Sequence, residues 1–246
     1  MSDSGSDAEA GAQLMMDVGS GLPCMTEEQK EKGWCGALRT TPLALVVPRL
    51  LGFGITYGIY AADADGASSQ VRNIAKLMGP GKPQTCGYLY LAIAVLSLLT
   101  WLLNFLPTLF KSQVMPGNAG NLRSNMLIYK SNVVDPAGPR LPYVVLEEDG
   151  DVGKYNRANR ALHHFGENSA ALAACVLLAG LIFPLPVLIL VVIYALARIW
   201  YQLAYTNGGY GLGCCKHGVP FAIHSVLVAP VFEMMVWFAG VKMTQL

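Results

Sequence analysis

Ionisable and tyrosine side chains gather in the otherwise apolar stretch between residues 154 and 210. On a helical wheel of about 100° per residue, one face of the first half collects the polar side chains Arg157, Arg160, His163, His164 and Glu167. The second half carries a second stripe, in which the residues at positions i, i+4, i+7 and i+11 are Tyr194, Arg198, Tyr201 and Tyr205. Charged groups on apolar helices are costly in lipid, so they usually face a bundle interior and a ligand. The two stripes therefore predict a polar ligand site between two neighbouring membrane helices.

The depth of these residues decides which of them can meet. A Pro-Leu-Pro turn at 184–186 separates the two helices. With a rise of 1.5 Å per residue, Glu167 lies roughly 26 Å from that turn and Tyr201 roughly 25 Å. Arg198 can reach the same level, whereas Arg160, at about 37 Å, lies at the membrane surface. Two interpretations follow: a polar funnel that admits a ligand, or a buried Glu167–Arg198 ion pair that only fixes the helix register.

The composition indicates an integral membrane protein. The chain has 246 residues, of which 53% are hydrophobic and 13% are charged, against about a quarter charged in an average soluble domain. The apolar residues form runs near the length that crosses a bilayer core of about 30 Å. A net charge of +1 and the lack of a basic patch give no reason to expect a nucleic-acid partner. The six cysteines form no C-x-x-C pair, so neither a disulfide framework nor a metal site is predicted.

The expected fold class is all-α, an integral membrane four-helix bundle. The bundle domain is expected at 86–246, with a long polar loop at 111–154 between its first two helices. The predicted spans are about 86–110, 155–183, 186–206 and 219–241. The 155–183 and 186–206 helices are joined by only a couple of residues, so they must run antiparallel.

The N-terminal third is expected to be an addition to this bundle. Residues 1–40 are polar and without periodicity, which predicts a flexible tail. Residues 41–85 combine an apolar segment at 43–62 with a polar connector that contains Gly79-Pro80-Gly81. The apolar segment carries Pro48 and Arg49, so we expect a short or tilted fifth membrane helix.

Lysine and arginine near the predicted helix ends set the orientation. Seven of them lie on the face with the long loop and four on the opposite face. This bias places the 111–154 loop on the cytoplasmic side or its organellar equivalent. The acidic N-terminus resembles neither a secretory signal nor a transit peptide. We therefore expect a multi-pass protein of the endoplasmic reticulum or another organelle membrane.

The two stripes resemble the signature of the MAPEG superfamily, the membrane-associated proteins in eicosanoid and glutathione metabolism. Residues 157–168, R-A-N-R-A-L-H-H-F-G-E-N, are similar to R-A-x-x-N-x-x-E, and residues 198–205, R-I-W-Y-Q-L-A-Y, to R-x-x-Y-x-x-x-Y. The order of helices agrees over about 86–243. The resemblance implies a homotrimer of four-helix bundles that binds glutathione between neighbouring subunits near the cytoplasmic face.

The resemblance also implies roles for individual residues. It gives a glutathione-binding set, joined by Arg157 from the same stripe: Arg157, Arg160, His164, Glu167, Arg198 and Tyr201. A carboxylate of glutathione can be held by an arginine in a bidentate pair, and its ammonium can be accepted by Glu167. Tyr205 or Lys216 would assist the thiol, and no metal is implied.

Two positions depart from the family pattern. His164 stands where the family has asparagine. Leu212 stands where catalytic members have an arginine that lowers the pKa of the glutathione thiol, and only the thiolate attacks electrophiles effectively. Lys216 is the nearest cation in the sequence.

Two functions from different classes remain open. One is a glutathione-dependent transferase or peroxidase that acts on lipophilic electrophiles taken from the membrane. The other is a non-catalytic scaffold or accessory subunit of a membrane complex, whose pocket holds lipid or glutathione. A transporter or channel is disfavoured because only four or five helices are available. Glu233, an acid inside the last span, is either functional or has a buried hydrogen-bonded or subunit-contact role. Cys214-Cys215 are expected to flank a turn, with palmitoylation or metal binding together with His217 as the alternatives.

Overall fold

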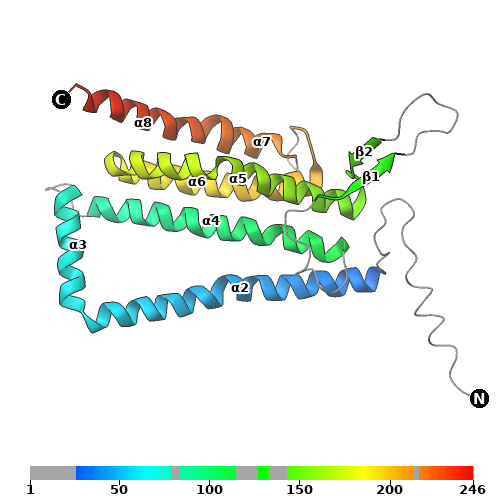
Figure 1. Cartoon of the computed structure of the whole chain (residues 1–246), viewed down its shortest axis with the longest axis horizontal. Coiled ribbons are helices and arrows are strands. Elements are labelled where there is room, and N and C mark those ends of the chain that lie inside the picture. The colour runs from blue at the N-terminus through cyan, green and yellow to red at the C-terminus, as the bar shows by residue number, and fades with distance from the viewer. Residues whose placement is uncertain (1–25, 79–83, 115–126, 133–142, 213–215, 246) are drawn as a thin grey trace, which may run out of the picture.

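Four long apolar helices run side by side and form the bundle (Figure 1). The computed structural model describes residues 26–78, 84–114, 127–132, 143–212 and 216–245. The first three spans are α4 (Gln84–Val114), α5 (Gly150–Ile182) and α6 (Pro184–Gly208). The fourth is continuous from Gly218 to Met243. The protein is therefore an integral, multi-pass membrane protein, and the predicted all-α membrane bundle is confirmed.

The antiparallel α5–α6 pair follows from a one-residue connection. Phe183 ends α5, where its N–H donates to Ala179 O at 2.7 Å, and Pro184 begins α6. Proline suits the first helical position because its missing N–H has no intrahelical partner there. On the facing helix α4, Leu89 packs so closely against Gly180 that a Cβ there would clash.

The centre of the bundle is filled by apolar side chains from all four spans. In lipid, helices associate through close packing rather than through a hydrophobic driving force. The fully buried members, at most 3% exposed, are Ala92, Leu99, Leu103, Val176, Ala179, Val187, Val191, Val228 and Phe232. This packing holds the polar faces of α5 and α6 in fixed register.

The last span contains a π-helical segment. It consists of α7 (Gly218–Phe221), η1 (Ala222–Val228) and α8 (Ala229–Met243). The N–H of Ala229 donates to His224 O, five residues back. Pro230 follows at once, and its ring cannot fit against the carbonyl four residues earlier in a regular α-helix. The wider turn relieves that conflict, and it also points His224 into the bundle, where it is 1% exposed.

The N-terminal addition is helical over more of its length than expected. Helix α2 (Glu27–Ala62) starts at a capping box of Thr26 and Gln29, so the prediction of a flexible tail is wrong for residues 27–40. Residues 1–25 lie outside the described part. Within α2 only 46–62 is apolar throughout, and this stretch is shorter than the four spans. Whether it crosses the membrane as a short or tilted helix stays a prediction.

Helix α2 lies antiparallel against α4. The ring of Trp34 is 6.0 Å from that of Phe110, and Arg49 stands 5.6 Å from the Trp101 ring centroid. Helix α3 (Ala64–Met78) then crosses the far end of the bundle at a steep angle (Figure 1). The connector expected between the apolar segments is thus a helix up to residue 78.

A short β-hairpin stands at the opposite end of the bundle. Strand β1 (Tyr129–Asn132) pairs antiparallel with β2 (Tyr143–Leu146), with Tyr129 opposite Leu146. The predicted loop 111–154 is shortened at both ends, because α4 continues to Val114 and α5 begins at Gly150. Within that loop the structure contains this hairpin, of which the sequence indicated only a short strand-like piece at 141–146.

Candidate functional site

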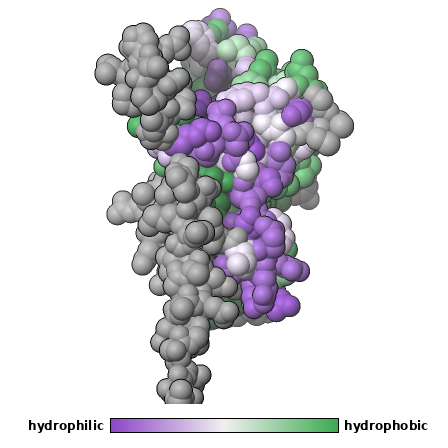
Figure 2. Space-filling view, turned by 90° about the vertical axis from the view of Figure 1, so that its right-hand side faces the viewer, coloured by the Kyte–Doolittle hydropathy of each residue, from purple (hydrophilic) through white to green (hydrophobic). Residues whose placement is uncertain are grey.

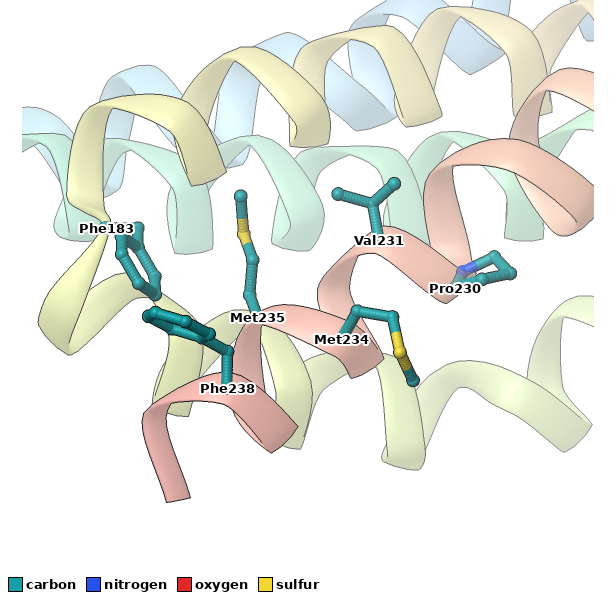
Figure 3. A pocket seen from close by; sticks show the side chains of 6 residues that line it. All are labelled: Phe183, Pro230, Val231, Met234, Met235 and Phe238. Carbon is teal, nitrogen blue, oxygen red and sulfur yellow. The ribbon is translucent and has the colours of Figure 1, made fainter. Parts of the chain in front are cut away.

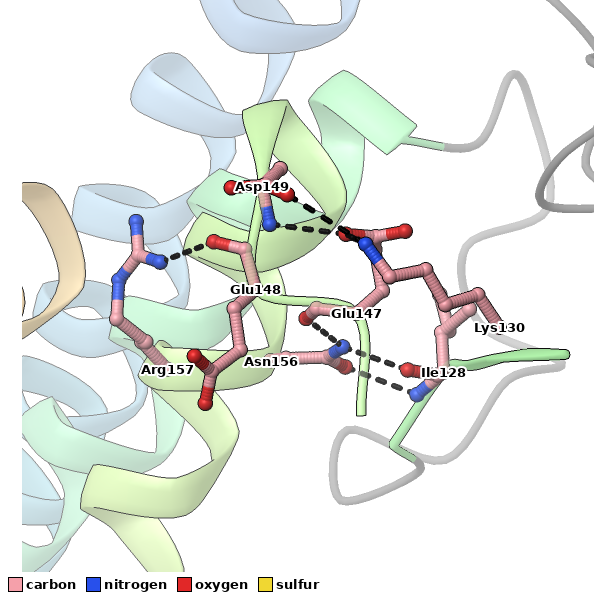
Figure 4. Close-up of polar contacts among 7 residues, drawn as sticks. All are labelled: Ile128, Lys130, Glu147, Glu148, Asp149, Asn156 and Arg157. Carbon is pink, nitrogen blue, oxygen red and sulfur yellow. Dashed lines mark hydrogen bonds and ion pairs between the residues drawn. The ribbon is translucent and has the colours of Figure 1, made fainter. Parts of the chain in front are cut away.

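The hairpin is fixed to α5 by one buried amide. Asn156 is 1% exposed, and its Oδ1 accepts from the N–H of Ile128 at 2.9 Å. Its Nδ2 donates to Ile128 O at 2.7 Å and to Glu147 O at 2.8 Å (Figure 4). A single side chain thereby satisfies three backbone groups of the two strands. This clamp positions the hairpin over the ends of α5 and α6.

The hairpin, α5 and α6 together enclose a hollow of about 220 Å³. It lies at the hydrophilic end of the bundle, which is seen in Figure 2. Basic, acidic and phenolic groups share its wall, among them Glu148, Arg157, Arg160, Tyr205 and Tyr210. The hollow therefore brings together polar side chains from both helices that carry the sequence motifs.

The two arginines of the hollow have different surroundings. Arg157 Nε donates to Thr206 O at 3.0 Å, and its Nη1 donates to Glu148 O at 2.6 Å (Figure 4). It joins α5, α6 and the segment after β2, so two of its five N–H donors serve the fold. Arg160 is exposed and has no hydrogen-bond or ion-pair partner among the residues that the structure describes. Arg160 is the arginine whose donors remain free for a ligand.

Arg198 is fully buried between α5 and Tyr201 and does not line the hollow. One nitrogen, Nη2, donates to Ala161 O, while the guanidinium carbon stands 4.5 Å from the Tyr201 ring centroid. Its Nε and Nη1 have no acceptor in the described part of the chain. A buried cation with unmet donors is costly unless an anion joins it.

Glu167 does not supply that anion. Its side chain is exposed on α5, and no ion pair with Arg198 is formed among the described residues. The interpretation of these two residues as a register-fixing ion pair is therefore wrong. The estimate of depth placed Glu167 near the level of Tyr201, but the direction of its side chain takes it out of the bundle.

Aromatic rings surround Arg198 and extend to the hollow. Tyr201 and Tyr205 stack with ring centroids 5.7 Å apart. Three histidine rings contact Tyr201, at 6.1 Å for His164, 5.9 Å for His217 and 5.0 Å for His224. The sequence alone did not place His217 and His224 beside the tyrosines. Pro230 was the available sequence signal for His224. A proline there does not fit a regular α-helix, and the wider turn that accompanies it directs His224 into the bundle.

The turn after α6 decides which cation lies beside the tyrosines. It requires glycine at Gly209 and Gly211, whose φ angles are 62° and 135°. Lys216 folds back, and its Nζ donates to Gly208 O. Leu212 is 82% exposed. Neither side chain therefore takes the place of the arginine implied by the family resemblance.

His217 packs against the tyrosines at the end of α6. Its ring is 5.4 Å from that of Tyr205 and 5.0 Å from that of Tyr210, and the Tyr205 hydroxyl donates to the Tyr210 hydroxyl at 3.0 Å. The Nδ1 of His217 lies 3.1 Å from Gly209 O. Because a carbonyl only accepts, Nδ1 must carry the hydrogen, which leaves Nε2 as the nitrogen that exchanges a proton.

Ion pairs at the rim of the hollow stabilise the hairpin. Lys130 Nζ lies 2.9 Å from Glu147 Oε1. Burial acts to raise the pKa of Glu147, but the N–H of Asp149 and the ammonium of Lys130 outweigh it, so the pKa is lowered overall. The hydrogen bond and the ion pair with Glu147 have the opposite effect on the lysine and raise the pKa of Lys130. Both groups are therefore charged at neutral pH.

The structure thus divides the candidate residues into groups. Arg157, Arg160 and Tyr205 line the hollow, Tyr201 stacks on Tyr205, and Arg198 and His164 contact Tyr201. Glu167 faces outward and Lys216 is engaged by the turn. Cys214-Cys215 lie outside the described residues. In the described part of the chain, no group of three histidine, cysteine or acidic side chains is arranged to hold a metal ion.

These features define a four-span membrane protein with a polar hollow at one end of the bundle. The family model described as MAPEG family matches residues 87–213, just over half of the chain. The protein belongs to the MAPEG family. No curated protein and no solved structure matches it.

Proposed function

We propose that the hollow binds glutathione and that the protein is a glutathione-dependent transferase or peroxidase acting on lipophilic electrophiles. The observation that carries the proposal is the meeting of Arg160 and Tyr205, one from each motif helix, in one hollow of about 220 Å³. Members of the MAPEG family commonly bind glutathione. The electrophile would enter from the surrounding lipid, because the spans expose apolar side chains over most of their surface.

The charges of the site fit the charges of glutathione, which has two carboxylates and one ammonium. Arg160 offers free donors at the surface, and Arg198 offers Nε and Nη1 in the buried interior. Arginine holds a carboxylate through two parallel hydrogen bonds. Glu148, on the rim of the hollow, can accept the ammonium. The unmet donors of Arg198 are the strongest argument for an anionic ligand, since the chain itself provides no counter-ion among its described residues.

When bound, glutathione supplies a thiol that reacts as its thiolate. The Tyr205–Tyr210 pair has one hydroxyl hydrogen left to donate to that sulfur, since the other joins the two tyrosines. His217 takes the thiol proton on Nε2 and becomes an imidazolium, while its Nδ1–H stays on Gly209 O. His217 therefore assists Tyr205 in the role first assigned to Lys216.

One observation favours a second candidate function. The arginine position of catalytic members is Leu212, and this side chain is 82% exposed. A non-catalytic MAPEG-like scaffold or accessory subunit would keep the hollow and bind glutathione or lipid without turnover.

The assembly we propose is a homotrimer or a subunit of a larger membrane complex. Glu167 and His163 are exposed on a helix that crosses the membrane. Polar groups on such a surface are costly in lipid, and a neighbouring subunit would cover them. The hairpin end would lie on the cytoplasmic-equivalent side of the endoplasmic reticulum or another organelle membrane.

Thermal unfolding of the detergent-solubilised protein with and without glutathione tests the proposal. Glutathione should raise the unfolding temperature of the wild type and of Arg72→Ala, a matched control on α3 at the far end. It should not raise that of Arg160→Ala. Equal stabilisation of Arg160→Ala, or no stabilisation of the wild type, would contradict the proposed site.

A second measurement separates the two candidate functions. The thiolate absorbance of bound glutathione is read against pH. A thiol pKa well below the ordinary value of about 8.5 favours the enzyme, and an ordinary value favours the scaffold.

A further inference from the structure

A second polar cavity lies inside the membrane spans, deeper than the hollow. Its volume is about 200 Å³, and it is enclosed by α5, α6 and the last span. Its wall includes Asn168, Cys175, Tyr194, Ser225 and Glu233. Glu233 stands 15 residues into the last span, roughly 22 Å from its start at 1.5 Å per residue. The carboxyl group is therefore far from either end of the helix.

Polar groups of this cavity lack partners. Glu233 lies on the exposed side of the cavity and forms no hydrogen bond or ion pair among the residues that the structure describes. Tyr194 is 5% exposed, and its hydroxyl has no hydrogen-bond partner within the same described set. Polar groups inside a membrane are costly unless they are paired. Two unpaired groups in one cavity indicate a ligand that pairs with them.

Several groups of the wall can accept a hydrogen bond. Asn168 Nδ2 donates to His164 O at 2.8 Å, which leaves its Oδ1 to accept. Ser225 Oγ is occupied at 2.7 Å with His224 Nδ1. The Glu233 carboxylate and the Tyr194 oxygen complete the set. A ligand that fits this wall brings several donors and a positive charge, which is the description of an ammonium group.

An apolar groove adjoins the cavity on the same helix. It has a volume of about 440 Å³ and shares Pro230 with the cavity. Figure 3 shows Phe183 and Phe238 facing one another at one end, with their ring centroids 6.4 Å apart, and Met234 and Met235 on either side of the helix. Methionine and aromatic side chains adapt well to apolar ligands of varied shape.

We infer that the cavity and the groove together bind a lipophilic amine. The ammonium group pairs with Glu233 and is accepted by Tyr194 and Asn168, and the hydrocarbon body lies against the Met234–Phe238 turn. A fatty acid would place a second negative charge beside Glu233, and a neutral alcohol would leave that charge unpaired. This site is separate from the hollow and does not depend on the proposed glutathione chemistry.

Binding of dodecylamine to the protein in phosphatidylcholine nanodiscs tests the inference. These nanodiscs contain no anionic lipid that could compete for the amine. Tryptophan fluorescence provides the signal, to which Trp237, exposed on α8 one turn beyond Glu233, contributes as one of four tryptophans. Dodecan-1-ol, which has the same chain without the charge, controls for partitioning into the bilayer.

The variants separate the charge from the shape of the site. Glu233→Gln should weaken amine binding about tenfold or more, as expected for the loss of a charged hydrogen bond, and should leave dodecan-1-ol unchanged. Glu31→Gln, on the exposed polar part of α2, is the matched control and should bind like the wild type. Amine binding by Glu233→Gln at wild-type affinity would overturn the inference, as would an equal loss of amine and alcohol.

A second variant keeps the test decisive if Glu233→Gln does not fold. Ala171 lines the cavity, so Ala171→Leu fills the space and leaves the acid in place. Loss of amine binding in this variant supports the cavity as the site. Unchanged binding contradicts it.

Discussion

The hairpin clamp and the membrane cavity use polar side chains in opposite ways. At the clamp, Asn156 makes three hydrogen bonds to the backbone and Arg157 makes two. Within the spans, Arg198 and Glu233 keep polar atoms without partners in the described structure. Polar side chains thus stabilise the fold in one region and, in the two proposals above, bind a ligand in the other. The comparison predicts opposite consequences for the same kind of substitution.

The largest expected effect is on the clamp. Asn156→Ala removes three hydrogen bonds and leaves buried backbone groups without partners, which should lower the free energy of unfolding by about 3 kcal/mol. Denaturant unfolding measures this change. Asn168→Ala is the control, since Asn168 is exposed and makes one hydrogen bond within its own helix. A similar loss in both variants would show that the clamp has no special role.

The two arginines Arg157 and Arg198 provide the direct contrast. Arg157→Met should destabilise the protein by about 2 kcal/mol, because two backbone acceptors lose their donor. Arg198→Met should leave stability unchanged or raise it, since an unpaired buried charge is replaced by an apolar chain. The same Arg198→Met should abolish stabilisation by glutathione. Thermal unfolding with and without glutathione measures the stability and the glutathione response of each variant. Equal destabilisation of Arg157→Met and Arg198→Met would contradict the contrast.

His217 should affect turnover more than binding. His217→Ala removes the proton acceptor beside Tyr205, so conjugation of an aryl halide should slow on the order of tenfold to a hundredfold, while glutathione affinity changes little. Lys216→Ala is the control because its ammonium is engaged by Gly208 O. The pH profile of the rate distinguishes proton transfer from a structural role, since only the loss of an acceptor shifts it. Equal rates for His217→Ala and Lys216→Ala would show that His217 takes no part in the reaction and would leave Tyr205 alone to assist the thiol.

The smallest expected effect is the pH dependence of the hairpin rim. The pKa of Glu147 is lower in the folded protein than its ordinary value of 4.5. Its stabilising contribution is therefore complete above that value and is lost as the pH falls through the folded pKa. The stability difference between wild type and Glu147→Gln should shrink between pH 4.5 and more acidic conditions. A difference that stays constant with pH would show that the carboxylate charge is irrelevant.

The sequence predicted the spans well because length and hydropathy determine them. The apolar runs and the Pro184 turn defined the antiparallel α5–α6 pair, and the spacing of Arg160 and Tyr205 placed both on faces that meet. These features are local or periodic, so they can be predicted from a single chain.

What the sequence did not reveal depends on contacts between distant residues. The hairpin is held by Asn156, 28 residues from Ile128, and no periodicity signals such a clamp. Depth placed Glu167 near Tyr201, but a wheel could not show that its side chain faces away. Only the folded turn shows that His217, rather than its neighbour Lys216, lies against the tyrosines.

The π-helical turn at Ala222–Val228 determines how α8 is rotated about its own axis, and therefore which of its side chains face the bundle. Removing one residue from this segment would restore a regular α-helix and rotate α8 by about 100° relative to His224. Glu233 would then leave the cavity, and Met234 would leave the groove. One additional amino acid in a single helical turn therefore determines which neighbours the second half of the last span meets.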